Sequence, residues 1–156
     1  MKQANVSESP AKQVAGFIAK FDPAIARLTR HCRSILRKRY PSAIELVYDN
    51  YNALAIGYSP TERTSDVVFS LAVYARGVNL YFMYGRSLDD PDRLLQGSGN
   101  QGAFIRLDGV ETLDEEKVKK LIERAVKRQR PTFGAKGRGY TIVKSISAKQ
   151  RPRRPG

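Results

Sequence analysis

The spacing of apolar residues predicts two helices near the start of the chain. The first begins at Ser9-Pro10, a pair typical of an N-cap and a first helical position. The second begins at Asp22-Pro23 and ends at Tyr40, because a residue that precedes proline avoids helical backbone angles. Apolar residues recur at helical spacing in both: Val14, Phe17, Ile18 and Phe21, then Ile25, Leu28, Cys32, Ile35 and Leu36. Each helix therefore has one face to bury.

From residue 44 the period of the pattern changes to two, which predicts strands. Residues 44–48 and 53–58 form one pair around a turn, and residues 67–74 and 78–84 form a hairpin at Arg76-Gly77. One side of these strands carries large apolar groups. The other side carries small residues, namely Ala53, Ala55, Gly57, Ser70 and Ala72. Because small residues let a helix approach closely, we expect helices on at least one face.

The remaining third of the chain adds shorter signals. Asp90-Pro91 predicts a helical turn through Leu95, and residues 103–107 predict a fifth strand. Thr112 and Glu115 have the spacing of a capping box before a helix with a strong apolar face. Residues 140–146 have the pattern of a short strand, and residues 150–156 have the composition of a disordered segment. This order predicts an α+β fold, an antiparallel sheet of about five strands with two N-terminal helices and one C-terminal helix.

Positive charge is concentrated at the C-terminal end. The 156 residues carry a formal net charge of +13. Residues 127–156 hold ten Lys or Arg and no acid, which leaves 18 basic against 15 acidic side chains in the rest. We divide the chain into a flexible N-terminus (1–8), a domain (9–130) and a basic C-terminal tail (131–156). Such asymmetry indicates an acidic partner, and nucleic acid or another polyanion is the commonest.

The cysteine content and the lack of long apolar runs favour a reducing, cytoplasmic compartment. Cys32 is the single cysteine, so an internal disulfide is excluded and a reducing environment fits. No apolar run approaches the length that spans a bilayer, and the first residues lack the apolar core of a signal peptide. We expect a cytoplasmic protein with no membrane partner.

Three short motifs together resemble one known family. Residues 88–99 (LDDPDRLLQGSG) combine an L-x-D-P turn with a Leu-Leu-x-Gly-x-Gly loop, and the strand after them carries Arg106. Residues 40–45 (YPSAIE) are similar to a P-x-A-x-E entry to a sheet. Over about residues 17–126 the chain resembles the YdhG-like family of unknown function. The resemblance implies a compact α+β domain and no established activity. Some relatives are described as frataxin-like iron chaperones, which require an acidic ridge, whereas this body is mildly basic.

The glycine-rich segment 97–102 is one candidate site. It matches G-x-G-x-x-G, but a dinucleotide-binding fingerprint needs a strand before it and a helix after it, and the predicted order here is different. Its backbone N–H groups could instead hold an anion. Such a site would bind a small molecule or an anion, and it could also be catalytic. Its candidate residues are Arg86, Arg93, Gly97, Gly99 and Arg106. The simpler interpretation is a turn whose glycines supply positive φ.

Sets of residues typical of catalysis or metal binding are weak in this sequence. Asp89, Asp90 and Asp92 lie close together, but Asp90 before Pro91 suits an N-cap better than a metal ligand. Cys32 lies on an apolar face, and His31 is the single histidine, so a zinc site or a Cys-His pair is unconvincing. We expect no metal and no cofactor. We favour a non-enzymatic protein and leave an Asp-based or Arg-based mechanism open.

The leading hypothesis is a binding module that contacts nucleic acid without reading its sequence. Its candidate residues lie on the second helix and in the tail: Arg27, Arg30, Arg37, Lys136, Arg138, Arg151, Arg153 and Arg154. A basic stripe on a helix is usually only a solvated face, and it becomes informative if the tail lies beside it. The tyrosines of the strands could stack bases, or they could simply pack in the sheet as aromatic residues do.

Overall fold

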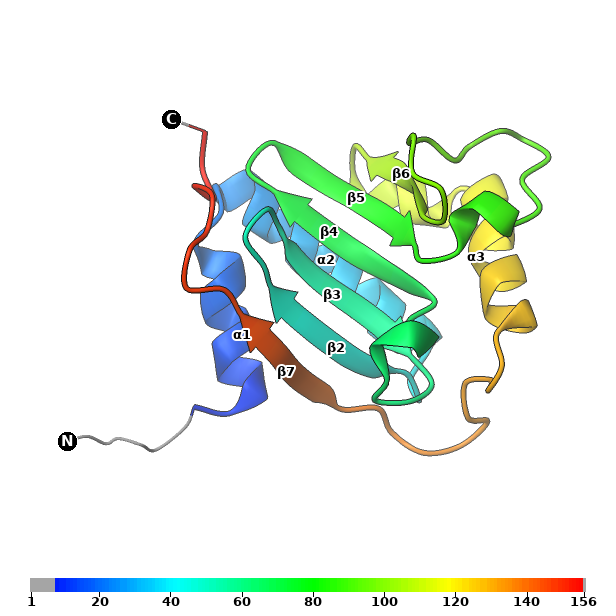
Figure 1. Cartoon of the computed structure of the whole chain (residues 1–156), viewed down its shortest axis with the longest axis horizontal. Helices are drawn as coiled ribbons and strands as arrows, with labels where there is room; N and C mark the ends of the chain where they lie inside the picture. The colour runs from blue at the N-terminus through cyan, green and yellow to red at the C-terminus, as the bar shows by residue number, and fades with distance from the viewer. Residues whose placement is uncertain (1–7, 156) are drawn as a thin grey trace.

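The predicted helices form and lie on one side of a sheet. The computed structural model describes residues 8–155, so the expected flexible N-terminus (1–8) lies outside them apart from Glu8. In Figure 1, α2 (Pro23–Arg39) runs behind the sheet and α1 (Pro10–Ala19) lies along its β7 edge, and α3 (Glu116–Arg128) joins the same core. The Ser9 side chain accepts a hydrogen bond from the Lys12 N–H, so this N-cap prediction is confirmed.

The sheet is mixed rather than purely antiparallel. Its strands are β2 (Ile44–Asp49), β3 (Leu54–Ser59), β4 (Phe69–Tyr74), β5 (Gly77–Phe82), β6 (Ala103–Leu107) and β7 (Thr141–Ile146). The spatial order is β6-β5-β4-β3-β2-β7. The first five are antiparallel neighbours, as predicted, and β7 is a sixth strand parallel to β2. The α+β class is therefore confirmed, and the strand predicted at 140–146 forms, but its parallel pairing with β2 was not predicted.

The C-terminal segment is held against the domain. Strand β7 pairs with β2 from Glu45–Thr141 to Asp49–Ile146. Beyond β7, Arg153 is only 6% exposed, and its guanidinium donates to Asp49 Oδ1 at 2.9 Å and to the Asn50 carbonyl at 2.6 Å. The predicted disorder of residues 150–156 is therefore wrong for the described part of that segment. A charged, weakly apolar segment tends to be disordered because it buries little apolar surface, but here the buried Asp49 carboxylate holds Arg153 in place.

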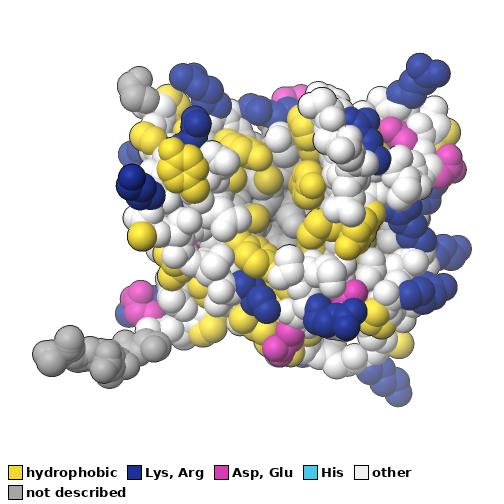
Figure 2. Space-filling model, viewed as in Figure 1, with side chains coloured by type: hydrophobic (Ala, Val, Ile, Leu, Met, Phe, Trp, Pro, Cys, Tyr) yellow, Lys and Arg dark blue, Asp and Glu magenta, His cyan; other side chains and the backbone are white. Residues whose placement is uncertain are grey.

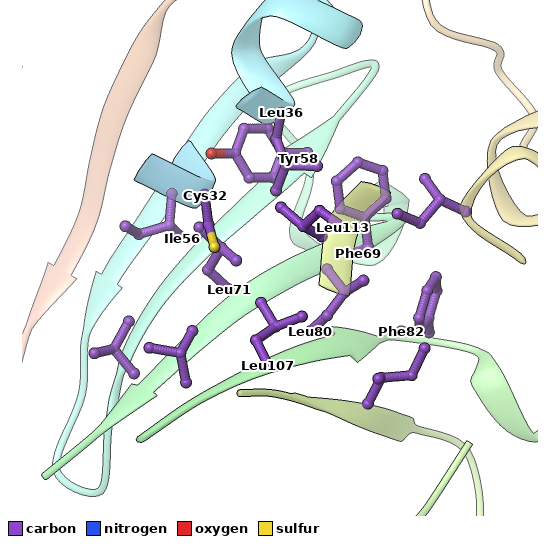
Figure 3. Packing of buried hydrophobic residues seen from close by; sticks show 14 of the residues in the cluster. Cys32, Leu36, Ile56, Tyr58, Phe69, Leu71, Leu80, Phe82, Leu107 and Leu113 are labelled. Atoms are coloured by element: carbon purple, nitrogen blue, oxygen red, sulfur yellow. The ribbon is translucent and has the colours of Figure 1, made fainter. Parts of the chain in front are cut away.

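The two faces of the sheet differ in side-chain size. Large apolar side chains point toward α2 and α3 and form the core, and Figure 3 shows Ile56, Leu71 and Leu80 among them. The small residues Ala55 and Ala72 face the other way, where no helix of the described chain packs. Helices cover one face, as expected, but it is the face with the large residues of β3 and β4 and not the face with the small residues that prompted the expectation. On the open face β2 also carries Ile44 and Leu46, which form a second apolar cluster with Val67.

Two predicted helix starts are wrong. No helix follows Asp90, whose carboxylate instead accepts the N–H groups of Leu94 and Leu95, each at 2.9 Å. Such local bonds offer the backbone an alternative to a helix. The expected capping box also fails, because a 3₁₀ turn (η3, Val110–Asp114) precedes α3 and its N-cap residue Glu115 makes no side-chain capping bond.

Candidate nucleic-acid interface

Basic side chains of α2 follow the helix surface toward its C-terminal end. Arg30, Arg37 and Lys38 are exposed, and together with Arg33 they line a shallow groove of about 360 Å³. Arg27 is exposed one turn earlier on the same helix. The helical period places these basic side chains on the solvent side of α2, because the apolar residues between them face the core.

The segment before β7 brings a further arginine to this surface. Arg37 and Arg138 line the same cleft of about 230 Å³, together with Tyr40 and Tyr140. The Gly139 N–H donates to the Pro41 carbonyl at 2.7 Å, and a Cβ at Gly139 would collide with the Ala43 carbonyl. Glycine at 139 therefore lets the chain pass close to the end of α2. We call Arg30, Arg37, Lys38 and Arg138 the basic cleft.

A buried carboxylate lies at the base of this cleft. Glu45 is 2% exposed, and Arg33 donates to both of its oxygens at 2.9 Å. The hydroxyls of Tyr58 and Thr141 donate to it at 2.8 and 2.7 Å. Arg37 stays 3.9 Å away and keeps half of its side chain exposed. Glu45 thus anchors α2, β3 and β7 to one point, while half of the Arg37 side chain stays open to solvent.

These contacts set the ionisation of the group. Burial alone would raise the pKa of Glu45, but the hydrogen bonds and charge of Arg33, helped by Thr141 and Tyr58, outweigh burial and lower that pKa. Burial raises the pKa of Tyr58, and the neighbouring Glu45 raises it further. The carboxylate is therefore ionised and the Tyr58 hydroxyl protonated at neutral pH. With its oxygens already hydrogen-bonded, Glu45 suits a structural role better than that of a general base.

The C-terminal arginines do not join the basic cleft as one group. Arg153 is buried against Asp49, which is fully buried and also binds Lys20 at 2.9 Å. Arg154 donates to the Lys20 carbonyl, and Arg151 lies over the Tyr51 ring, 5.7 Å from its centroid. Of the candidate residues, Arg37 and Arg138 line one cleft, and Arg37 also lines the adjoining groove with Arg30. Lys136 is exposed in the loop before Arg138.

The glycine-rich candidate site is spread over separate places. The Arg86 Nε donates to the Gly99 carbonyl at 2.8 Å, so this side chain braces the loop. Arg106 donates instead to the Arg76 carbonyl, at the far end of β6 from the loop. Gly97 has a φ of +116° and Arg93 a φ of +54°, which is the geometry expected for a turn. The simpler interpretation of this loop thus fits its geometry better than an anion site does.

Other candidate groups also have structural roles. Cys32 is fully buried, as its apolar position predicted, and burial followed by the charge of Glu111 raises its pKa to about 12. Among residues 8–155, no three His, Cys, Asp or Glu side chains are grouped to hold a metal ion. In the same range no helix combines the length and the apolar character needed to cross a bilayer.

The sequence interpretation missed the buried ionic groups. Glu45, Asp49, Arg33 and Arg153 were visible as charges, but only the fold shows that they are buried together. Comparison of the chain with protein-family models, with curated proteins and with solved structures finds no match. Its function must therefore be argued from its own residues.

Proposed function

We propose that the protein is a non-enzymatic binding module that holds the phosphate backbone of a nucleic acid through the basic cleft. The observation that carries this proposal is the meeting of Arg37, from α2, and Arg138, from the distant C-terminal segment, in one cleft. A guanidinium can donate two parallel hydrogen bonds to a phosphate, so two arginines across a cleft match two sides of an anion. Arg30 and Lys38 extend the positive surface along α2.

Contact of this kind reads no bases. Phosphate contacts position a nucleic acid but carry no sequence information. Binding should therefore tolerate any sequence and weaken steeply with salt, because each neutralised phosphate releases counterions. We further propose that the chain is a YdhG-like protein of the cytoplasm. The motifs at 40–45 and 88–107 and the single reduced cysteine support that assignment.

A charge-reversal pair tests the basic cleft. Arg37→Glu with Arg138→Glu should lower affinity for a fluorescently labelled 20-nucleotide DNA at least tenfold at low salt, measured by anisotropy. It should also reduce the slope of log affinity against log salt by about 1.5 to 2, which corresponds to the loss of two phosphate contacts.

The matched control is Lys117→Glu with Lys120→Glu, two exposed lysines of α3 that change the net charge equally. If the control lowers affinity as much as the cleft variant, binding follows net charge and the cleft is not the site. Unchanged affinity in the cleft variant would reject the proposal outright.

A further inference from the structure

The face of the sheet that lacks helices carries an aromatic depression. Figure 2 views this face and shows apolar side chains around a hollowed centre. The depression has a volume of about 530 Å³, with Tyr51, Tyr74 and Tyr81 around a floor of Ala55 and Ala72. We call it the tyrosine depression. Tyr51 is 48% and Tyr74 41% exposed, so these rings are not core residues.

Register explains the hollow. Ala55 pairs with Ala72 in adjacent strands, so two methyl groups lie side by side at the centre of the face. Tyr74 lies two residues after Ala72 in β4 and Tyr81 lies in β5, so their rings stand on the same face as that floor. A flat aromatic guest could enter above the alanines and stack on an exposed tyrosine ring. The volume is large enough for a nucleobase.

An unused hydrogen-bonding group lies beside the floor. Asn79 is the cross-strand neighbour of Ala72 and precedes Tyr81 by two residues, which places all three on one face. Its Oδ1 is buried and has no hydrogen-bond partner among the described residues. A buried acceptor without a partner costs free energy, so such an atom needs an explanation. Because this atom is covered by its neighbours and Asn79 does not line the depression, the amide is not a contact for a guest there.

Arginines border the same face. Arg151 lies over the Tyr51 ring, and Arg106 is opposite Asn79 on β6. The Arg106 guanidinium lies so close to Gly77 that a Cβ there would collide with it, and it is fixed to the Arg76 carbonyl at 2.7 Å. Glycine at 77 thus lets Arg106 lie along the sheet. Exposed cations beside exposed rings match a ligand that combines aromatic bases with phosphates.

We propose that the tyrosine depression binds an unpaired base of single-stranded nucleic acid. The base enters above Ala55 and Ala72 and stacks on the exposed rings of Tyr51 and Tyr74, and Arg106 and Arg151 contact the flanking phosphates. Only an unpaired base exposes its face and its hydrogen-bonding edge, so a duplex is a poor ligand here. This inference rests on the proposed function only in that the ligand is nucleic acid, because the residues involved are different.

Ring-removal variants with a ring-retaining control test the inference. Tyr51→Ala and Tyr74→Ala should each weaken binding of a labelled 12-nucleotide oligo-dT about fivefold or more, the effect expected for losing one base stack. Tyr74→Phe should bind like the wild type, because it keeps the ring. Affinity for a duplex of the same length should stay within twofold in all variants. Both tyrosines are exposed, so the variants should remain folded, which circular dichroism checks.

The outcomes are separable from those for the basic cleft. Loss of oligo-dT affinity in the alanine variants alone, with Tyr74→Phe unaffected, supports a base site whether or not Arg37 and Arg138 matter. Unchanged affinity in both alanine variants overturns it. It is overturned equally if sedimentation shows a wild-type dimer that Tyr74→Ala dissociates while oligo-dT affinity is unchanged, because the face would then be an interface between copies.

Discussion

The two faces of the sheet consist of alternate residues of the same strands, but helices cover one face and leave the other open. Residues such as Ile56 and Leu71 point toward the helices and are fully buried. Their immediate neighbours Ala55 and Ala72 point to the open face and line a depression. Burying a large aliphatic side chain contributes roughly 1.5–3 kcal/mol, whereas a methyl group offers much less. Helices therefore settle on the side with more apolar surface to bury, and the small residues Ala55 and Ala72 are left on the open side.

The largest expected effect is on the covered side, where β2 places a charge among core residues. Asp49→Ala should lower the free energy of unfolding by about 3–5 kcal/mol, because it leaves Arg153 buried without its carboxylate. Urea unfolding followed by circular dichroism measures this. Asp108→Ala, at an exposed acid after β6, is the control and should change stability by about 0.5 kcal/mol or less. A small effect of Asp49→Ala would mean that the C-terminal segment is not held there.

A neighbouring pair in β4 compares the faces directly. Leu71→Ala should cost about 2–5 kcal/mol, because it opens a cavity in the core. Ala72→Leu should change stability by under about 1 kcal/mol, because nothing packs over that position and the added side chain fills open space. The same urea titration reports both. If Ala72→Leu were as damaging as Leu71→Ala, the open face would have to be covered.

Acidification should lower the stability of the protein through the two buried carboxylates on the covered face. The folded-state pKa values of Glu45 and Asp49 lie below their ordinary values of 4.5 and 3.8, so on acidification the unfolded chain binds protons before the folded one does. The contribution of these groups is complete at neutral pH and declines as pH falls below about 4.5. Thermal unfolding between pH 7 and pH 3 should show this fall. A melting temperature that rises toward pH 3 would contradict it.

Much of the fold followed from periodicity. Helical spacing located α1, α2 and α3, and alternation located β2 to β6 with errors of one or two residues at most ends. The two wrong helix starts both rested on short signals. The Asp90 carboxylate binds local backbone N–H groups and no helix forms there, and a 3₁₀ turn at 110–114 takes the place of the capping box expected at Thr112 and Glu115. A signal that covers a single turn is weak, because local side-chain hydrogen bonds to the backbone can favour a conformation other than a helix.

The candidate interface was less accessible to sequence. Arg37 and Arg138 could be named as basic residues, but their meeting depends on how the chain after α3 returns to β2. The burial of Arg153 was not predicted, although the charges of β2 indicated a buried partner. Glu45 and Asp49 flank Val47 on the inward side of β2, where all three are buried, and a charge at such a position needs an opposite charge beside it.

The pairing of β7 with β2 also has a consequence for biosynthesis. Thr141 bonds to Glu45 at a sequence separation of 96, so β2 emerges from the ribosome long before its parallel neighbour exists. Until then the outer edge of β2 offers unpaired backbone groups that invite pairing with another nascent chain. Shortening the protein ahead of β7 would make that transient exposure permanent, and such a product should accumulate as insoluble material.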